Sequence, residues 1–417
     1  MRRLQGEEIR LRVRECVNSV QVTDIHTHLY DPAFGGLLLW GIDDLLVYHY
    51  LIAEGFRHLE ISYEDFWALP KENQADLIWN ALFIERSPIS EACRGVITTL
   101  NALGLDPKKR NLGSIRQWFA GWTVEDYTSH CLDLAGVKSV YMTNSPFDDE
   151  ERAVWEAGFR HDRRFQAGLR LDPLVLGWNE SGKILQELGF RIRQDLGGKT
   201  ISEIRRFLED WTAKIEAHYL MLSLPSDFCY PGTTVCHRIL EGALLPHCRE
   251  HGLPLGLMMG VKRRVNPRLG LAGDGVGRTD LQALAALCEK FPENKFLVTV
   301  LSRENQQELC VLARKFRNLH VFGCWWFTNV PSIIDEITRM RLELLGASFT
   351  AQHSDARVLD QLIYKWKHSR DIIGKVLADK YVELTATGWQ VTDEELQRDI
   401  EGLFGGAFRD FKKLKLS

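Results

Sequence analysis

The chain has 417 residues, of which 45% are hydrophobic and 26% are charged, and its formal net charge is −4. This composition is that of a globular protein able to bury a large core, and the small negative charge favours neither nucleic acid nor an anionic membrane as a partner. No stretch of about 18 uninterrupted apolar residues occurs, so no membrane-spanning helix is expected.

The N-terminal segment and the cysteines indicate the compartment. The opening sequence MRRLQGEEIRLRVREC is charged and lacks the apolar stretch of a secretory signal. Nine cysteines are scattered along the chain without a CxxC pair, which favours buried free thiols over a disulfide framework. We therefore expect a cytoplasmic protein.

Short apolar runs bounded by turn residues follow one another along the chain, as is typical of buried parallel strands. Eight such runs cover residues 22–25, 139–142, 165–171, 219–224, 255–259, 296–301, 320–324 and 348–351. Amphipathic helical patterns follow several of them, over residues 201–216, 303–316, 332–345 and 356–377. The alternation predicts a closed parallel (β/α)₈ barrel of the TIM type. An open doubly wound sheet is the alternative, but no GxGxxG motif or P-loop follows a strand.

The connection from the first to the second strand is far longer than a βα crossover needs. Residues 42–135 have mostly helical patterns, for example over 43–54 and 74–83. We expect a helical insertion there, on the catalytic face of the barrel. The glycine-rich residues 270–277 are predicted to be a loop, and residues 392–413 a C-terminal amphipathic helix. Residues 1–417 are expected to form one domain.

The motif Thr23-Asp24-Ile25-His26-Thr27-His28 ends the first predicted strand. Side chains alternate along a strand, so His26 and His28 point to the same side. At the carboxyl end of a barrel strand both imidazoles would face the mouth, where barrel enzymes carry out their chemistry. Two neutral imidazoles at this spacing can bind a divalent ion such as Zn²⁺.

A third metal ligand could come from the end of the eighth strand, which leads into His353-Ser354-Asp355-Ala356-Arg357. The first and last strands of a closed barrel are neighbours, so Asp355 can approach the histidine pair as a metal ligand or as a base. The alternative is that Asp355 caps a helix starting at Ala356. His353 is a weaker candidate, with an ordinary polar role as its alternative.

Arginines follow four of the predicted strands, at Arg170, Arg263, Arg303 and Arg357. Arginines converging on a barrel mouth suit a carboxylate or phosphate ligand through paired hydrogen bonds. Each of them taken singly could instead be a surface ion-pair partner.

Aromatic residues occur at two further places near the expected mouth. Trp325-Trp326-Phe327 follows the seventh strand and could form the floor of a sugar site or pack in the core. His49-Tyr50 lies in the predicted insertion, where the two rings could contribute to a lid or be buried.

Several of these motifs together resemble those of one enzyme family. DIHTHL, the His49-Tyr50 pair, LRLDP, the WWF run and HSDAR are similar to motifs of the uronate isomerases (glucuronate/galacturonate isomerases) of the amidohydrolase superfamily. The resemblance covers nearly the whole chain. It implies a distorted barrel with one divalent metal ion, usually zinc, and a uronic acid as the small-molecule substrate.

The resemblance also implies a reaction and roles for single residues. The reaction is the reversible conversion of D-glucuronate to D-fructuronate, and of D-galacturonate to D-tagaturonate. His26, His28 and Asp355 match the metal-site positions, and Tyr50 matches an active-site tyrosine. The substrate-contacting arginines of the family match Arg170, Arg263 and Arg357.

The resemblance predicts a mechanism in which a proton moves from C2 to C1 through a cis-enediol. The metal would hold the substrate carboxylate and a neighbouring hydroxyl. Asp355, alone or through a metal-bound hydroxyl, would take the C2 proton. Tyr50, with His49, would transfer a proton between the C1 and C2 oxygens, and Arg170 and Arg357 would offset negative charge.

One position departs from the family pattern. Many members carry a histidine on the fifth strand, where this chain has Met258, and a thioether is a poor zinc ligand. Water or substrate would then complete the coordination. Two other functions stay open: a mononuclear amidohydrolase or lactonase acting on a sugar acid, and a sugar-acid binding protein without catalysis. The oligomeric state also stays open, with a homo-oligomer among the options.

Overall fold

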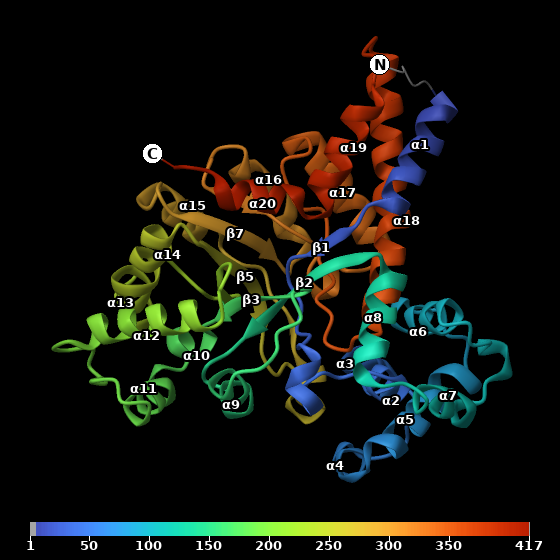
Figure 1. The fold of residues 1–417 in the computed structure, drawn as a ribbon, viewed down its shortest axis with the longest axis horizontal. Helices are drawn as coiled ribbons and strands as arrows, with labels where there is room; N and C mark the ends of the chain where they lie inside the picture. Colours follow the sequence, from blue (N-terminus) through green and yellow to red (C-terminus); the bar gives the residue numbers. More distant parts are fainter. Residues whose placement is uncertain (1–5, 417) are drawn as a thin grey trace.

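The computed structural model describes residues 6–416, so residues 1–5 of the N-terminal segment considered above lie outside the described residues. A parallel sheet curls through the centre in the order β1-β2-β3-β4-β5-β7-β8 (Figure 1). Its strands are β1 (Val22–Asp24), β2 (Val137–Asn144), β3 (Phe165–Arg170), β4 (Leu220–Pro225), β5 (Pro254–Lys262), β7 (Lys295–Val300) and β8 (Leu319–Val321).

The sequence predicted these seven strands because both faces of the sheet are buried. Eight of the nine residues of β5 and all six of β7 are buried. Residues at the same level pair in parallel across the sheet, for example Leu222 with Leu257 and Leu257 with Val298. Strands covered on both faces are continuously apolar rather than alternating. The predicted fold class is confirmed, with a distortion at the seam.

The eighth predicted strand, residues 348–351, is not an extended strand in the structure. It contributes one bridge, between Thr350 and Phe322, and the Ala351 amide then donates to the Leu403 carbonyl (2.9 Å) instead of to β1. The seam closes further on, where the Asp355 amide donates to the His26 carbonyl (3.2 Å). The barrel is therefore distorted between its last and first strands, next to the histidine motif.

The C-terminal residues separate the two sides of this seam. The single helix predicted over residues 392–413 is two helices, α19 (Asp393–Glu401) and α20 (Ala407–Lys413), joined through a kink. Gly405 has a φ of 119°, and a Cβ atom there would lie 2.6 Å from the Cβ of Thr23. Glycine is thus required for the segment to pass so close to β1.

Helices fill the long connection between β1 and β2, as the sequence predicts. They are α2 (Ile42–Leu46), α3 (His49–Gly55), α4 (Tyr63–Ala68), α5 (Lys71–Trp79), α6 (Glu91–Ala102), α7 (Leu112–Phe119) and α8 (Val124–Ala135). The helix expected over residues 43–54 is interrupted because Tyr48 is extended (φ −67°, ψ 142°). This break starts α3 at His49 and directs the first turn of α3 toward the barrel mouth.

The remaining long helices cover the outside of the sheet. They are α1 (Gly6–Ser19), α9 (Asp149–Ala157), α11 (Trp178–Glu187), α12 (Thr200–Lys214), α14 (Leu245–His251), α15 (Leu281–Lys290), α16 (Gln306–Ala313), α17 (Pro331–Leu345) and α18 (Gln361–Ala386). The longest, α18, runs beside α1 (Figure 1) and begins at Gln361 rather than at the predicted Ala356. None of the helices within residues 6–416 is long and apolar enough to cross a membrane.

A short antiparallel addition was not predicted. β6 (Gly275–Val276) lies within the glycine-rich residues expected to be only a loop, and it pairs with the end of β5. This pairing holds the segment after β5 over the mouth of the barrel.

Candidate active site

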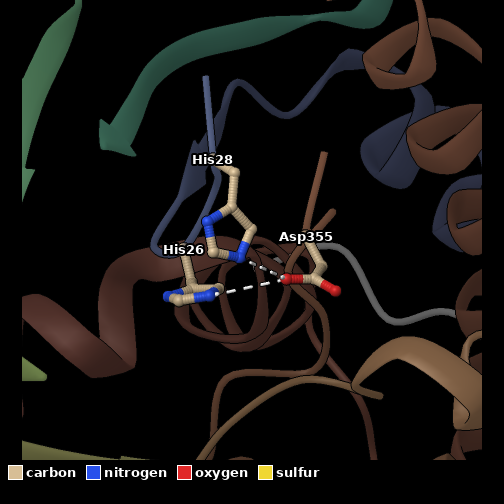
Figure 2. Close-up of side chains that lie close together, drawn as sticks. All are labelled: His26, His28 and Asp355. Atoms are coloured by element: carbon tan, nitrogen blue, oxygen red, sulfur yellow. Dashed lines mark ion pairs between the residues drawn. The ribbon is translucent and has the colours of Figure 1, made fainter. Parts of the chain in front are cut away.

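His26, His28 and Asp355 converge at the carboxyl end of β1 (Figure 2). The Nε2 atoms of His26 and His28 each lie 3.5 Å from Oδ1 of Asp355. The imidazole rings stand edge to face, with their centroids 5.3 Å apart. Three ligand-type atoms from two distant segments of the chain thus face one point.

The tautomer of His28 follows from its neighbours. The Thr143 hydroxyl on β2 donates its proton to the Thr27 carbonyl (3.0 Å), so its oxygen can only accept from His28 Nδ1, 3.1 Å away. His28 therefore carries its proton on Nδ1 and presents an unprotonated Nε2 to Asp355. Burial, together with the positive charge of Arg357, holds the pKa of His28 below its usual value, which keeps the ring neutral.

His26 is oriented in a similar way, by a tyrosine hydroxyl beside its Nδ1 atom. The Tyr219 hydroxyl donates to the Ile25 carbonyl (3.0 Å) and lies 3.4 Å from His26 Nδ1. The proton of His26 is thus placed on Nδ1, and Nε2 faces Asp355. Hydrogen bonds to the far nitrogen of a metal-binding histidine fix the ring and make it a better ligand.

Asp355 does not cap a helix, since α18 begins at Gln361. Its backbone has a φ of 52°, which is a strained conformation for a residue other than glycine. Such strain persists only where the surroundings impose it, and here the Asp355 amide is tied to the His26 carbonyl. In this backbone conformation the carboxylate points toward the histidines.

Two buried charges hold the loop that carries Asp355. Asp24 accepts the Ser354 amide (3.1 Å) and the Trp366 indole N–H (2.9 Å). Lys365 donates to the Ser354 carbonyl (2.6 Å) from the other side. Asp24, the first residue of the DxHxH motif, is thus a positioning residue for the carboxylate across the seam.

The cluster fits a divalent metal ion. His26 Nε2 and Asp355 Oδ1 are buried and make no hydrogen bond within residues 6–416. The donor separations of 3.5 Å are close to the spacing of about 3.3 Å between ligands bound tetrahedrally at zinc distances. Burial raises the pKa of Asp355, but the positive charge of the nearby Lys365 helps to hold that pKa below its usual range, so the carboxylate is ionised. Neutral imidazoles beside a carboxylate are the donor set that such ions prefer.

A polar cavity opens next to the cluster. Its outer part has a volume of about 780 Å³, and a smaller inner chamber of about 60 Å³ includes Asp355 in its wall. Both parts share five lining residues, namely His28, Arg170, Ser223, Arg263 and Arg357. Three of the four arginines considered from the sequence therefore line one cavity beside the histidines.

Carboxylates fix two of these arginines. Asp172 accepts from Arg170 (2.7 Å) and also from the Ser223 amide on β4 (2.6 Å). Asp274 accepts from Arg263 (2.5 Å) just before β6. Fixed guanidinium groups lose little side-chain entropy when they bind an anion.

Arg303 was wrongly grouped with the cavity arginines. It is exposed, its Nε pairs with Glu336 of α17 (2.8 Å), and it lines neither part of the cavity. The turn after β7 directs it outward.

Aromatic side chains complete the inner chamber. Trp325 and Trp326 line it together with Tyr48 and His49, and the His49 and Trp326 ring centroids are 5.4 Å apart. Burial and the nearby Arg357 lower the pKa of His49 to about 3, so this imidazole is neutral. The insertion thus supplies part of the wall over the mouth.

Tyr50 is placed beside the chamber rather than among its lining residues. Its ring packs edge-on against His49 at 4.6 Å and against Tyr48 at 4.9 Å. Its hydroxyl is buried without a hydrogen-bond partner in residues 6–416, and burial and the neighbouring tyrosine raise its pKa. A buried hydroxyl without a partner is a group that a substrate can engage.

Two other residues near the histidine and aspartate cluster, His353 and Met258, were considered from the sequence. His353 is fully buried 5.3 Å from the His26 ring, but it lies outside the group of three that can share one ion. Met258 is buried in the barrel interior with Ile25 and Tyr219. Neither adds an anionic donor to the cluster.

Several functional residues were not identified from the sequence. The supporting groups are Asp24, Thr143, Asp172, Tyr219 and Asp274, and the added chamber residue is Tyr48. Asp24 and Asp172 stood inside quoted motifs, so their carboxylates were visible signals. Thr143 and Tyr219 have no recognisable signal in the sequence, because their roles depend on contacts between strands.

We expect Thr143→Val to weaken metal binding by about 10- to 100-fold, since it removes the acceptor that fixes the His28 tautomer. The measurement is zinc affinity in competition with a chelator. Thr128→Val is the matched control, because the Thr128 hydroxyl is buried in α8 without a partner in the described chain. Equal affinities in the two variants would remove Thr143 from this role.

Comparison with solved structures shows which known proteins this chain is similar to. The uronate isomerase of Bacillus halodurans C-125 is 51% identical to this chain, with a TM-score of 0.96, over 98% of this chain and 96% of that one. The uronate isomerase of Thermotoga maritima (15% identity, TM-score 0.77, 98% of both chains) and the glucuronate isomerase of Caulobacter crescentus (16%, 0.66, 97% and 94%) share the fold. No family model and no curated protein matches the chain. The high identity over nearly the full length of both chains shows that this chain belongs to the uronate isomerase family.

Proposed function

We propose that this protein interconverts D-glucuronate with D-fructuronate and D-galacturonate with D-tagaturonate. The observation that carries the proposal is that three arginines and His28 line both the outer cavity and the smaller inner chamber, whose wall includes Asp355. A uronate is an anion with several hydroxyl groups, and such a cavity offers a guanidinium for the carboxylate and ligand-type atoms for the oxygens.

We propose Zn²⁺ as the resident ion, held by His26, His28 and Asp355. When bound, the ion would fix oxygen atoms of the substrate and offset negative charge that develops on them. Met258 would supply no ligand, so water or substrate would complete the coordination.

Asp355 is proposed as the base. In the aldose, C1 is the carbonyl carbon and C2 carries both a hydrogen and a hydroxyl group. Asp355 takes the C2 proton, and the C2–H electron pair forms the C1–C2 double bond while O1 gains a proton, which gives the cis-enediol. Asp355 then returns its proton to C1 as O2 loses its proton, which leaves the ketose. The Asp355 carboxylate is ionised, as a general base must be before it accepts a proton.

Tyr50 is proposed to supply the proton to O1 and to accept the proton from O2. Its unpartnered hydroxyl lies beside His49, whose ring is neutral and lines the chamber. His49 orients this transfer. Trp325 and Trp326 exclude water from the inner chamber, and Arg170 and Arg357 stabilise the negative charge of the substrate and of the enediol.

We also propose that the chain acts as one catalytic domain in the cytoplasm. All nine cysteines are free, and most are buried, which agrees with a reducing compartment.

The test is a ¹H NMR time course with glucuronate and with galacturonate, before and after chelation of metal. The expected result is formation of the matching ketose, with solvent deuterium entering at C1 in D₂O because the transferred proton exchanges on Asp355. Absence of ketose, together with hydrolysis of a uronolactone or a uronamide in a parallel reaction, would point to a hydrolase. Binding of uronate without turnover, at full metal occupancy, would contradict an enzymatic role.

We expect Arg357→Lys to lower kcat/KM by about 10- to 100-fold, since lysine cannot form the paired hydrogen bonds of a guanidinium with a carboxylate. Arg303→Lys is the matched control, because Arg303 also follows a strand but lies outside the cavity. Its kcat/KM should stay within about twofold of that of the wild type, as for most surface substitutions. A similar loss of kcat/KM in both variants would show that Arg357 has no role in the cavity that a surface arginine lacks.

A further inference from the structure

A second group of two histidines and one carboxylate lies on the outer helices. Glu209 is on α12, and His247 and His251 are on α14. In Figure 1 these helices lie on the side of the sheet away from α5, α6 and α7. Because α14 ends directly before β5, its last turn is at the amino end of the strands, opposite to the substrate cavity. The group is therefore separate from the active site.

The ligand atoms of the three side chains lie close enough together to share one metal ion. His247 and His251 are four residues apart on one face of α14, and their ring centroids are 4.2 Å apart. Glu209 Oε2 lies 2.9 Å from His251 Nε2 and 3.9 Å from His247 Nδ1. These separations lie on either side of the spacing of about 3.3 Å between ligands at tetrahedral zinc.

Hydrogen bonds occupy the other nitrogen of each ring. His251 Nδ1 lies 3.0 Å from the His247 carbonyl, which can only accept, so His251 carries a proton there. His247 Nε2 contacts the Thr212 hydroxyl at 3.0 Å, which leaves Nδ1 facing Glu209. Burial and the neighbouring His251 lower the pKa of His247 to about 4, so its ring is neutral. These contacts orient both rings as the support around a metal-bound histidine does.

We propose that Glu209, His247 and His251 bind a divalent transition-metal ion of the zinc class that ties α12 to α14, with water completing its coordination. Imidazole and carboxylate oxygen are donors suited to such an ion. The Glu209 side chain is 58% exposed and that of His251 34%, so an ion can enter from solvent, while His247 is buried and already positioned.

An ion pair between Glu209 and a protonated His251 is the simpler account of the short contact. Such an ion pair would leave His247 without a role and would bind no metal.

Equilibrium dialysis against Zn²⁺, followed by metal analysis, distinguishes a metal site from an ion pair. We expect the wild type to bind one more zinc per chain than His251→Ala or Glu209→Gln does. Asp210→Asn, a neighbouring exposed carboxylate that pairs with Arg206, should keep the wild-type stoichiometry.

The difference between variants is independent of the catalytic centre, which is intact in all of them, and their isomerase activity should equal that of the wild type. Thermal unfolding gives a second readout. Because an ion that binds only the folded state stabilises it, zinc should raise the Tm of the wild type and Asp210→Asn more than that of His251→Ala or Glu209→Gln. Equal zinc stoichiometry and equal Tm shifts in all four proteins would overturn the proposal. Should His251→Ala fail to fold, the exposed Glu209→Gln decides alone.

Discussion

Asp355→Asn is expected to lower kcat by about 10²- to 10⁴-fold, the usual contribution of a general base. Asparagine has nearly the same shape but cannot accept the C2 proton, and its amide group is a weaker metal ligand. The variant should keep its fold, because the main-chain contact from Asp355 to His26 does not involve the side chain. The measurement is kcat for ketose formation, together with the thermal unfolding midpoint and the metal content.

Asp360→Asn is the matched contrast, five residues further along the same segment. The Asp360 carboxylate accepts the Gly41 amide (2.8 Å) and the Tyr127 hydroxyl (2.5 Å), and neither residue lines the cavity. An amide N–H₂ group facing either donor would lower the free energy of unfolding by about 1–3 kcal/mol. We therefore expect Asp360→Asn to lose stability and keep kcat. Near-native kcat in a folded Asp355→Asn variant would exclude Asp355 as the base.

Tyr50→Phe is expected to lower kcat by about 10²- to 10⁴-fold with a smaller effect on KM, because it removes the proton donor for O1 but no charged contact to the substrate. The phenylalanine ring keeps the packing against Tyr48 and His49. Solvent deuterium exchange at C2 of the aldose reports whether Asp355 still removes that proton when transfer between the oxygens is blocked.

Tyr48→Phe is the comparison for this prediction, since Tyr48 is the neighbouring tyrosine and lines the chamber. We expect its kcat to fall by less than about tenfold, because the reaction assigns it no proton transfer. A large loss in Tyr48→Phe with little change in Tyr50→Phe would move the shuttle to Tyr48.

The fold was predictable where local pattern and burial agree. The central strands β5 and β7 are almost continuously apolar and buried, and that pattern is visible in the sequence. Residues 348–351 look the same, but the kinked segment around Gly405 occupies the place where the eighth strand would pair with β1. Such competition between segments far apart in the chain leaves no local signal.

The candidate site also has features that the sequence predicts and features that it does not. The alternation of His26 and His28 and the closure of the barrel were enough to predict their meeting with Asp355. The start of α18 was not predictable, because the Gln361 side chain accepts the Arg357 and Val358 amides (2.9 and 3.2 Å) and delays the helix. Arg303 and Arg357 each follow a predicted strand, but Arg303 pairs with Glu336 of α17 while Arg357 lines the cavity, and the sequence does not show this difference.

Two imidazoles from β1 and one carboxylate from the seam are expected to bind a single ion. Diffraction from zinc-loaded crystals, recorded on both sides of the zinc absorption edge, tests this expectation directly. We expect an anomalous peak about 2.0–2.2 Å from His26 Nε2, His28 Nε2 and an Asp355 oxygen. At saturating zinc, absence of a peak at this point, with the three side chains otherwise in place, would contradict it.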